Sequence, residues 1–262
     1  MRRHLTVVAA LAALALTACG GSASSSVTSS AVSSLPDTAA GSITVFAASS
    51  LKEAFTQIGK DYEAAHPGAK VTFNFGASST LATQITQKAP ADVFASASQK
   101  TMDTVTAAGA ATGDKVFAVN TIEIATPPNP TTPVTSLADL AKPGVKVVIC
   151  QKDVPCGVAA AKLFTQNNLT VTPVSEEVDV KAVLSKVVLG EADAGIVYVT
   201  DVKAAGAKVA GVVIPKDQNV TTTYPIAPIA SSTNAVTAKA FVDFVLSPAG
   251  QTVLAAAGFT SP

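Results

Sequence analysis

The sequence predicts an α/β protein made of two units, and three observations indicate it. From residue 41 onward, apolar strand-like runs alternate with runs whose apolar residues recur at helical spacing. This alternation restarts near Ile124, before a group of prolines, and changes again near Tyr224. About 220 residues follow residue 41, enough for one large or two small domains. Alternating strands and helices of this length form mostly parallel sheets with helices on both faces.

The first unit is expected to contain three strand–helix pairs followed by a long extended run. Apolar residues from Leu51 to Ile58 follow the spacing of one helix face, and Pro67 and Gly68 end that helix. The expected strands are residues 42–48, 70–75, 91–97 and 115–128, and the expected helices are residues 50–68, 79–89 and 98–109.

The second unit is expected to repeat this pattern, and two helices close the chain. The chain end, 237–259, divides into two helices at Ser247 and Pro248, where proline cannot continue a helix. The expected helices before it are 136–144, 157–168 and 179–192, and the expected strands or extended runs are 145–150, 193–200, 211–217 and 221–230.

The N-terminal residues are typical of a secretory signal. Arg2 and Arg3 precede an apolar run, 5–16, that is too short to span a bilayer. The sequence LTAC, 16–19, resembles a bacterial lipobox, in which cleavage after residue 18 leaves Cys19 as a lipidated N-terminus. The alternative is an ordinary signal peptide with a chance cysteine. Residues 19–40 are expected to form a tether, because the Ser- and Gly-rich stretch 20–34 has little to bury.

Composition and charge exclude several classes of partner. The chain has 18 basic and 18 acidic residues, and removal of Arg2 and Arg3 with the signal leaves 16 against 18, a formal charge of −2. No basic stripe suggests nucleic acid. No segment after the signal is long and apolar enough to span a bilayer, so the membrane contact expected is the lipid on Cys19.

Two cysteines remain once Cys19 is assigned to the lipid. Cys150 and Cys156 lie six positions apart in a protein that faces an oxidising compartment, so we expect a disulfide between them. The alternative is two unpaired small residues in a core. A loop this short gains only about 2 kcal/mol from the link. Its main effect would be to stiffen the residues between the sulfurs.

The sequence offers little catalytic machinery. His66 is the only histidine after the signal, and it lies at a helix end next to Pro67, so no catalytic triad is expected around it. No cluster of metal ligands and no glycine-rich nucleotide loop occurs. Residues 49–52 fit the S-x-x-K pattern of penicillin-recognising enzymes, but the partner motifs S-D-N and K-T-G are missing. We therefore expect no enzyme and no cofactor.

Two strand-to-helix turns each place a pair of serines between a strand and a helix. One is VFAASSLKEAF, 45–55, and the other is NFGASSTLA, 74–82. The first turn of a helix has N–H groups without internal partners, where an oxyanion docks readily. Each serine could instead cap its own helix. Two such turns at the carboxyl ends of successive parallel strands, where open sheets bind ligands, favour a binding site. Neutral donors suit a fully ionised oxyanion, which carries only acceptors.

The chain resembles the molybdate-binding proteins of ABC transporters, which have the type II periplasmic binding-protein fold. The matching motifs run in family order from residue 43 almost to the C-terminus. They are ITVFAASSL, FGASSTLATQI, APADVFASASQKTMD, GIVYVTD, YPIA and SPAGQTVLAAAGF. The resemblance implies two lobes with a ligand cleft between them, each lobe a mostly parallel sheet flanked by helices. Lobe I would comprise 41–123 and 225–262, and lobe II 124–224.

The resemblance also implies a set of ligand groups. Ser50 and Ser78 match two serines that donate hydroxyl and backbone N–H bonds to the anion. Cys156, where many relatives have alanine, and Val180 match two positions that donate a backbone N–H. Tyr198 matches a tyrosine whose hydroxyl reaches the anion. Lys52 and Lys181 are close to these positions in sequence, and we expect them to be solvated helix residues.

The function that the resemblance implies is capture of molybdate or tungstate by a lipid-anchored, monomeric receptor outside the cytoplasm. The receptor would deliver the anion to a membrane permease. One alternative is a receptor for sulfate, phosphate or another oxyanion. Phosphate keeps a proton near neutral pH and would favour a carboxylate acceptor, for which Asp179 is the nearest candidate. Two others are a serine hydrolase or penicillin-binding enzyme using Ser50 and a purely adhesive surface lipoprotein.

Overall fold

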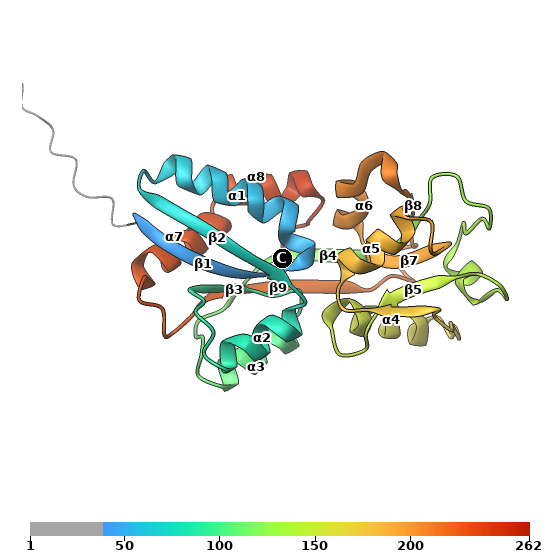
Figure 1. The fold of residues 1–262 in the computed structure, drawn as a ribbon, viewed down its shortest axis with the longest axis horizontal. Coiled ribbons are helices and arrows are strands. Elements are labelled where there is room, and N and C mark those ends of the chain that lie inside the picture. The colour runs from blue at the N-terminus through green and yellow to red at the C-terminus, as the bar shows by residue number, and fades with distance from the viewer. Residues whose placement is uncertain (1–38) are drawn as a thin grey trace, which may run out of the picture. The chain divides into compact units, whose positions relative to one another are not determined.

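Strands and helices alternate along the chain in the computed structural model, which describes residues 39–262 (Figure 1). The described residues belong to one unit. The expected α/β fold is therefore confirmed. The expected signal peptide, the expected lipidation site Cys19 and the expected tether up to residue 38 lie outside the described residues.

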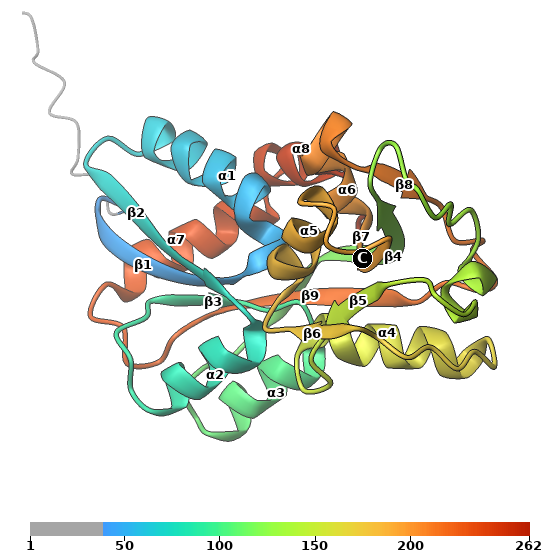
Figure 2. The same cartoon turned by 45° about the vertical axis from the view of Figure 1, so that its right-hand side comes forward.

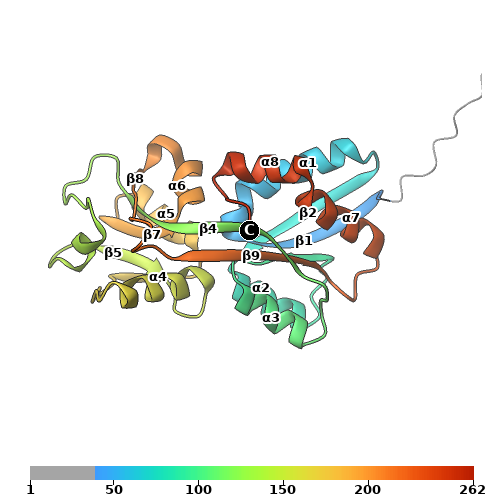
Figure 3. The ribbon, with the colours of Figure 1, turned by 180° about the vertical axis from the view of Figure 1, so that it is seen from behind.

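Lobe I is built on the parallel strands β2, β1 and β3, with helices on both faces. Figures 1 and 3 show α1, α7 and α8 over one face of these strands and α2 and α3 over the other. Its elements are β1 (Gly41–Ala48), η1 (Ser49–Leu51), α1 (Lys52–Ala65), β2 (Ala69–Gly76), α2 (Ser78–Thr86), β3 (Val93–Ala95), α3 (Gln99–Ala107), α7 (Ala235–Leu246) and α8 (Pro248–Ala257).

Lobe II repeats the arrangement around the parallel strands β7, β5 and β6. Figure 2 shows α5 and α6 on one side of these strands and α4 on the other. Its elements are η2 (Leu137–Ala141), β5 (Val147–Cys150), α4 (Pro155–Gln166), β6 (Ser175–Glu177), α5 (Val180–Val188), β7 (Ala194–Tyr198), α6 (Val199–Ala205), η3 (Gly206–Lys208) and β8 (Ala210–Val212).

Two long strands, β4 (Lys115–Thr126) and β9 (Thr221–Pro228), connect the two sets of parallel strands. They are antiparallel to each other, and the strand order across the described sheet is β2-β1-β3-β9-β4-β7-β5-β6, with β8 also paired to β4. β4 pairs with β9 up to Thr121 and with β7 from Ile122. The sequence pattern predicted the parallel strands but did not distinguish these antiparallel connections.

Apolar side chains divide into separate cores on the two sides of this connection. One core contains buried residues from Ile122 to Val220, together with Ala77 of lobe I. Two others contain only residues from the segments 39–118 and 224–259. Because Ala77 lies at the start of α2 and packs with the lobe II core, the two lobes are in contact there.

Two elements differ from the sequence prediction, and so does the role of the serines at the two turns. The expected strand 193–200 ends at Tyr198, and α6 begins at the next residue. β6 was not predicted, because it is short, polar and partly exposed rather than apolar. The serines of the two turns do not cap their helices, since the N-cap residues are Ala48 for η1 and Ala77 for α2.

No single described helix is long and apolar enough to cross a membrane. The pair α7 and α8 meets the length and composition criteria together, but it is bent by 59°. Residues of both helices, among them Phe241 and Leu254, are buried in the lobe I core.

Phe241 of α7 is expected to stabilise lobe I strongly. It is fully buried, and its ring lies 5.4 Å from Tyr62 and 6.2 Å from Phe55. Phe241→Ala should lower the free energy of unfolding by about 3–5 kcal/mol, measured by urea denaturation, because the cavity cannot fully collapse. Val236→Ala, at an exposed position of the same helix, should change it by less than about 0.5 kcal/mol. A loss below about 1 kcal/mol for Phe241→Ala would contradict this packing.

Candidate functional site

A small pocket between the lobes brings together all five predicted ligand residues. Ser50 and Ser78 line it from lobe I, and Cys156, Val180 and Tyr198 line it from lobe II. The other lining residues are Ala48, Ser49, Gly76, Ala77, Ala97, Val154, Pro155 and Asp179. Residues far apart in the sequence therefore converge on one place, as a ligand site between lobes requires.

Three of the helix starts in the walls of the pocket have N-caps that lack a polar side chain. The N-cap residues Ala48 of η1, Ala77 of α2 and Val154 of α4 all line the pocket, and none supplies a side-chain hydrogen bond to its helix. In contrast, Ser98 and Ser247 cap α3 and α8, away from the pocket. The uncapped first turns present N–H groups and the positive ends of helix dipoles, which is the chemistry that binds an anion.

Both pocket serines are buried, and each hydroxyl is hydrogen-bonded to a residue of another element. The Ser50 hydroxyl lies 3.0 Å from the Tyr224 hydroxyl. The Ser78 hydroxyl accepts a hydrogen bond from the backbone N–H of Ala97 at 3.0 Å. Each serine is therefore fixed in position by a neighbouring strand or loop rather than by its own helix.

The lobe II loop that leads into α4 is closed by a disulfide. Cys150 at the end of β5 and Cys156 in the first turn of α4 are bonded, as expected from their spacing. The loop folds tightly, because a Cβ on Gly157 would lie 1.9 Å from the carbonyl oxygen of Gln151. The disulfide and this close approach hold the start of α4 against β5, beside the pocket.

Asp179 and Val180 form the start of α5 on the same wall. Asp179 is the N-cap, and its carboxylate accepts a hydrogen bond from the backbone N–H of Ala182 at 3.0 Å. Val180, the first helical residue, is buried. The Asp179 carboxylate therefore caps the N-terminus of α5, although the residue also lines the pocket.

Tyr198 is the clearest sign of a ligand. Its side chain is buried, and its hydroxyl has no hydrogen-bond partner among the residues that the structure describes. Burial raises the pKa of this hydroxyl, with Tyr224 and Asp201 adding to the effect, so the group stays protonated. A buried hydroxyl left unpaired is costly, and this one lines the pocket.

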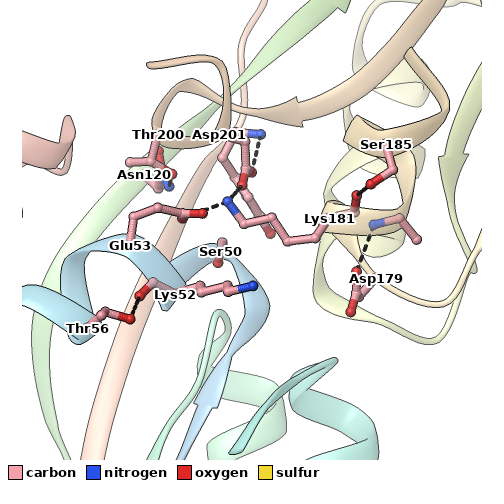
Figure 4. A network of polar contacts seen from close by, with 12 residues as sticks. Ser50, Lys52, Glu53, Thr56, Asn120, Asp179, Lys181, Ser185, Thr200 and Asp201 are labelled. Atoms are coloured by element: carbon pink, nitrogen blue, oxygen red, sulfur yellow. Dashed lines mark hydrogen bonds and ion pairs between the residues drawn. The ribbon is translucent and has the colours of Figure 1, made fainter. Parts of the chain in front are cut away.

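The expectation that Lys181 is a solvated helix residue is wrong. Its ammonium lies 2.9 Å from Asp201 Oδ1, in lobe II, and 2.7 Å from Glu53 Oε2, on α1 of lobe I (Figure 4). Burial alone would lower the pKa of Lys181, but the two carboxylates outweigh it and raise the pKa. The lysine is therefore charged and neutralised locally, and its ion pair with Glu53 links the two lobes.

Asp201 is the buried partner in this network. Its other carboxylate oxygen accepts from the backbone N–H of Tyr198 at 3.2 Å, at the start of α6. Burial raises the pKa of Asp201, while Lys181 opposes that shift. Asp201 thus joins Lys181 to the residue that carries the unpaired hydroxyl. Lys52, in contrast, is exposed as expected.

Sequence reasoning missed the polar residues behind the pocket. Asn120, Tyr224, Thr200 and Asp201 are all buried. Tyr224 and the pair Thr200-Asp201 belong to the motifs YPIA and GIVYVTD, which were quoted only for the resemblance. Asn120 was signalled weakly, as a polar residue in a long apolar strand. In the described part of the chain, no group of three or more His, Cys, Asp or Glu side chains could hold a metal ion.

Two α/β lobes joined by crossing strands, with a pocket of helix starts between them, define a solute-binding protein. The chain belongs to the family of bacterial extracellular solute-binding proteins, whose profile matches residues 43–260. The members of this family bind solutes and are not enzymes, which excludes the hydrolase alternative.

Comparison with known proteins gives similar sequences and a similar structure. The chain is 42% identical over 257 residues to the molybdate-binding protein ModA of Mycobacterium tuberculosis H37Rv, covering 98% of this chain and 97% of the relative. It is 34% identical over 236 residues to ModA of Escherichia coli K12, covering 84% and 89%. The periplasmic molybdate-binding protein of Azotobacter vinelandii shares the fold, with a TM-score of 0.75 at 21% identity over 84% of this chain and 99% of that one.

The buried ion pair of Lys181 is expected to matter for stability. Lys181→Met should lower the free energy of unfolding by about 3 kcal/mol, because it leaves the Asp201 carboxylate buried and unpaired. Combining it with Asp201→Asn should recover part of that loss. Urea denaturation measures both.

Lys186→Met supplies the matched control for Lys181→Met. Lys186 lies on the same helix, but its ion pair with Glu191 is exposed, so its loss should cost less than about 1 kcal/mol. Equal effects of the two substitutions would contradict the assignment of Lys181 to a buried network.

Proposed function

We propose that this protein captures molybdate, and also tungstate, in the pocket between its lobes and delivers the anion to the permease of an ABC transporter. The observation that carries the proposal is the set of uncapped helix starts and buried hydroxyls around one pocket. Relatives that cover nearly the whole chain are named as molybdate-binding proteins, which supports the choice of anion.

The proposed ligands act as neutral donors. Ser50, Ser78 and Tyr198 would donate hydroxyl bonds, and Cys156 and Val180 would donate backbone N–H bonds. A fully ionised tetrahedral oxyanion has acceptors on every oxygen, so each donor finds a match. Bonds of this kind to a charged group are worth about 1.5–3 kcal/mol each, so several together supply tight binding without a neighbouring arginine. Sulfate, being smaller, would leave some of these donors unfilled.

Capture would involve closure of one lobe on the other. We assign lobe I to 41–123 and 225–262 and lobe II to 124–224, because β4 and β9 are the strands that cross between the cores. Lobe I would contribute the two serines and lobe II the remaining three donors. The ion pair between Lys181 and Glu53 joins the same two lobes and would favour the closed arrangement.

We further propose that the protein is a monomer held on the outer face of the cell membrane by lipid on Cys19. The supporting observations are the short apolar leader, the LTAC sequence and the Ser- and Gly-rich stretch that follows. The lipid would keep the receptor near its permease, since more than one acyl chain gives stable anchoring.

A receptor for phosphate or another protonated oxyanion is the second candidate, and Asp179 is the observation that favours it. This carboxylate lines the pocket, and one of its oxygens is occupied by the N–H of Ala182. Phosphate keeps a proton near neutral pH and would need such an acceptor. Titrations with molybdate, sulfate and phosphate separate the two candidates.

Isothermal titration of the protein with molybdate tests the proposed function. We expect submicromolar binding that persists in excess sulfate. Replacing both Ser50 and Ser78 by alanine should weaken binding by roughly two to four orders of magnitude, because two charge-assisted bonds are lost. Binding of sulfate or phosphate in preference to molybdate would refute the assignment of the anion.

Ser79→Ala is the matched control for this titration. Ser79 follows Ser78 in the first turn of α2 but does not line the pocket. Its replacement should leave the affinity for molybdate unchanged. A loss similar to that of the double variant would mean that the pocket serines act only through helix stability.

A further inference from the structure

The hydroxyl of Ser50 is backed by a chain of buried polar side chains whose direction can be worked out. The side-chain oxygen Oδ1 of Asn120, on β4, accepts a hydrogen bond from the backbone N–H of Thr121 at 3.0 Å. This fixes the amide so that its nitrogen faces Thr200 Oγ1 at 2.9 Å and the Tyr224 hydroxyl at 3.5 Å. Figure 4 shows Asn120 and Thr200 side by side, with Ser50 nearby.

An amide nitrogen only donates hydrogen bonds, and this determines the direction in which the Tyr224 hydroxyl donates its proton. The Tyr224 oxygen faces that donor, so its own proton is directed to Ser50 Oγ, at 3.0 Å. In the reverse arrangement, Ser50 would donate to Tyr224, and the Tyr224 proton would have to turn toward the neighbouring Tyr198 hydroxyl, which makes no hydrogen bond in the described structure. Tyr224 is fully buried, so water does not offer an easy alternative. The proton of Ser50 is therefore left for the pocket.

Ser78 reaches the same state by a different route. Its oxygen accepts the backbone N–H of Ala97, which also lines the pocket. With its oxygen engaged, the Ser78 proton is available to a ligand. Two serines from different turns thus present their hydroxyl protons to the pocket. The oxygen of Ser78 accepts a hydrogen bond from an N–H group, and the oxygen of Ser50 accepts one from a tyrosine hydroxyl that an amide holds in place.

We propose that Tyr224 and Asn120 are positioning residues that hold Ser50 as a hydrogen-bond donor, so that the pocket prefers oxyanions without a proton over protonated ones. Neither residue lines the pocket, so both act through Ser50. This inference rests on the proposed function and adds to it the residues that set the preference. Asp179 is the one carboxylate among the described residues that line the pocket, and it is present in the unmodified protein and in every variant tested below.

The substitution Tyr224→Phe tests the inference. It removes the hydroxyl behind Ser50, so the serine can rotate and its oxygen can accept a proton from a ligand. In titrations at pH 7, we expect the Kd for molybdate to rise about tenfold, the loss of one oriented charge-assisted bond. The Kd for inorganic phosphate, which carries at least one proton at this pH, should stay the same or fall. The ratio of the Kd for phosphate to the Kd for molybdate should therefore fall by about tenfold or more.

Tyr62→Phe is the control for the loss of a buried tyrosine hydroxyl. Tyr62 is also fully buried in lobe I, but its hydroxyl bonds to backbone carbonyls of Ala39 and Thr237, away from the pocket. Tyr62→Phe should change neither the Kd for molybdate nor the Kd for phosphate.

Asn120→Ala is a second test variant, because it removes the amide that donates to Tyr224. It should lower the ratio of the Kd for phosphate to the Kd for molybdate, as Tyr224→Phe does, and it keeps the test available if Tyr224→Phe fails to fold. Thermal unfolding of each variant establishes that it is folded.

The possible outcomes separate this inference from the proposed function. If Tyr224→Phe weakens molybdate and phosphate equally, or weakens neither, the positioning role is refuted while the proposed function stands. If the unmodified protein does not bind molybdate, the proposed function itself fails. The inference is supported if the ratio of the Kd for phosphate to the Kd for molybdate falls in both Tyr224→Phe and Asn120→Ala and does not change in Tyr62→Phe.

Discussion

The structure depends on helix starts that are left without side-chain caps and are turned toward one another. Most helices satisfy their first N–H groups with a serine, threonine or aspartate, as α3 and α8 do here. At the pocket, alanine or valine occupies the N-cap position of η1, α2 and α4, and only α5 has a capping side chain there, that of Asp179. Alanine and valine N-caps cost stability, and the cost is offset only when something else accepts the free N–H groups. In the proposed function an anion between the lobes is that acceptor, and local instability of the helix starts would become affinity for a ligand.

The described residues that line the pocket include no cation, and they are rich in hydrogen-bond donors. Lys181, which is partly buried, is neutralised by Asp201 and Glu53 and does not line the pocket. Hydrogen bonds with the Ala97 N–H and with the Tyr224 hydroxyl hold the two serines in position. Rigid neutral dipoles of this kind bind a dianion without a strong opposite charge, which would slow its release. A transport receptor needs both capture and release.

The sequence predicted the parts of this account that local patterns carry. The strand–helix alternation follows from periodicity, and the two serine turns follow from local sequence, whereas the individual residues Ser50 and Ser78 were implied by the family resemblance. The structure adds what distant contacts decide. Ser50 and Tyr224 are 174 positions apart, and Lys181 meets Glu53 across 128 positions, so neither pairing has a local signal. For the same reason, a lysine on a helix face was expected to be solvated, although two remote carboxylates hold it.

The most direct test is a crystal structure of the protein with molybdate, in which anomalous scattering locates the molybdenum. The account predicts one ion between the lobes, with its oxygens about 2.7–3.1 Å from the hydroxyls of Ser50, Ser78 and Tyr198 and from the N–H groups of Cys156 and Val180. No lysine, arginine or metal cation should contact it. An ion held by a cationic side chain, or one found outside this pocket, would contradict the claim that neutral donors at helix starts bind the anion.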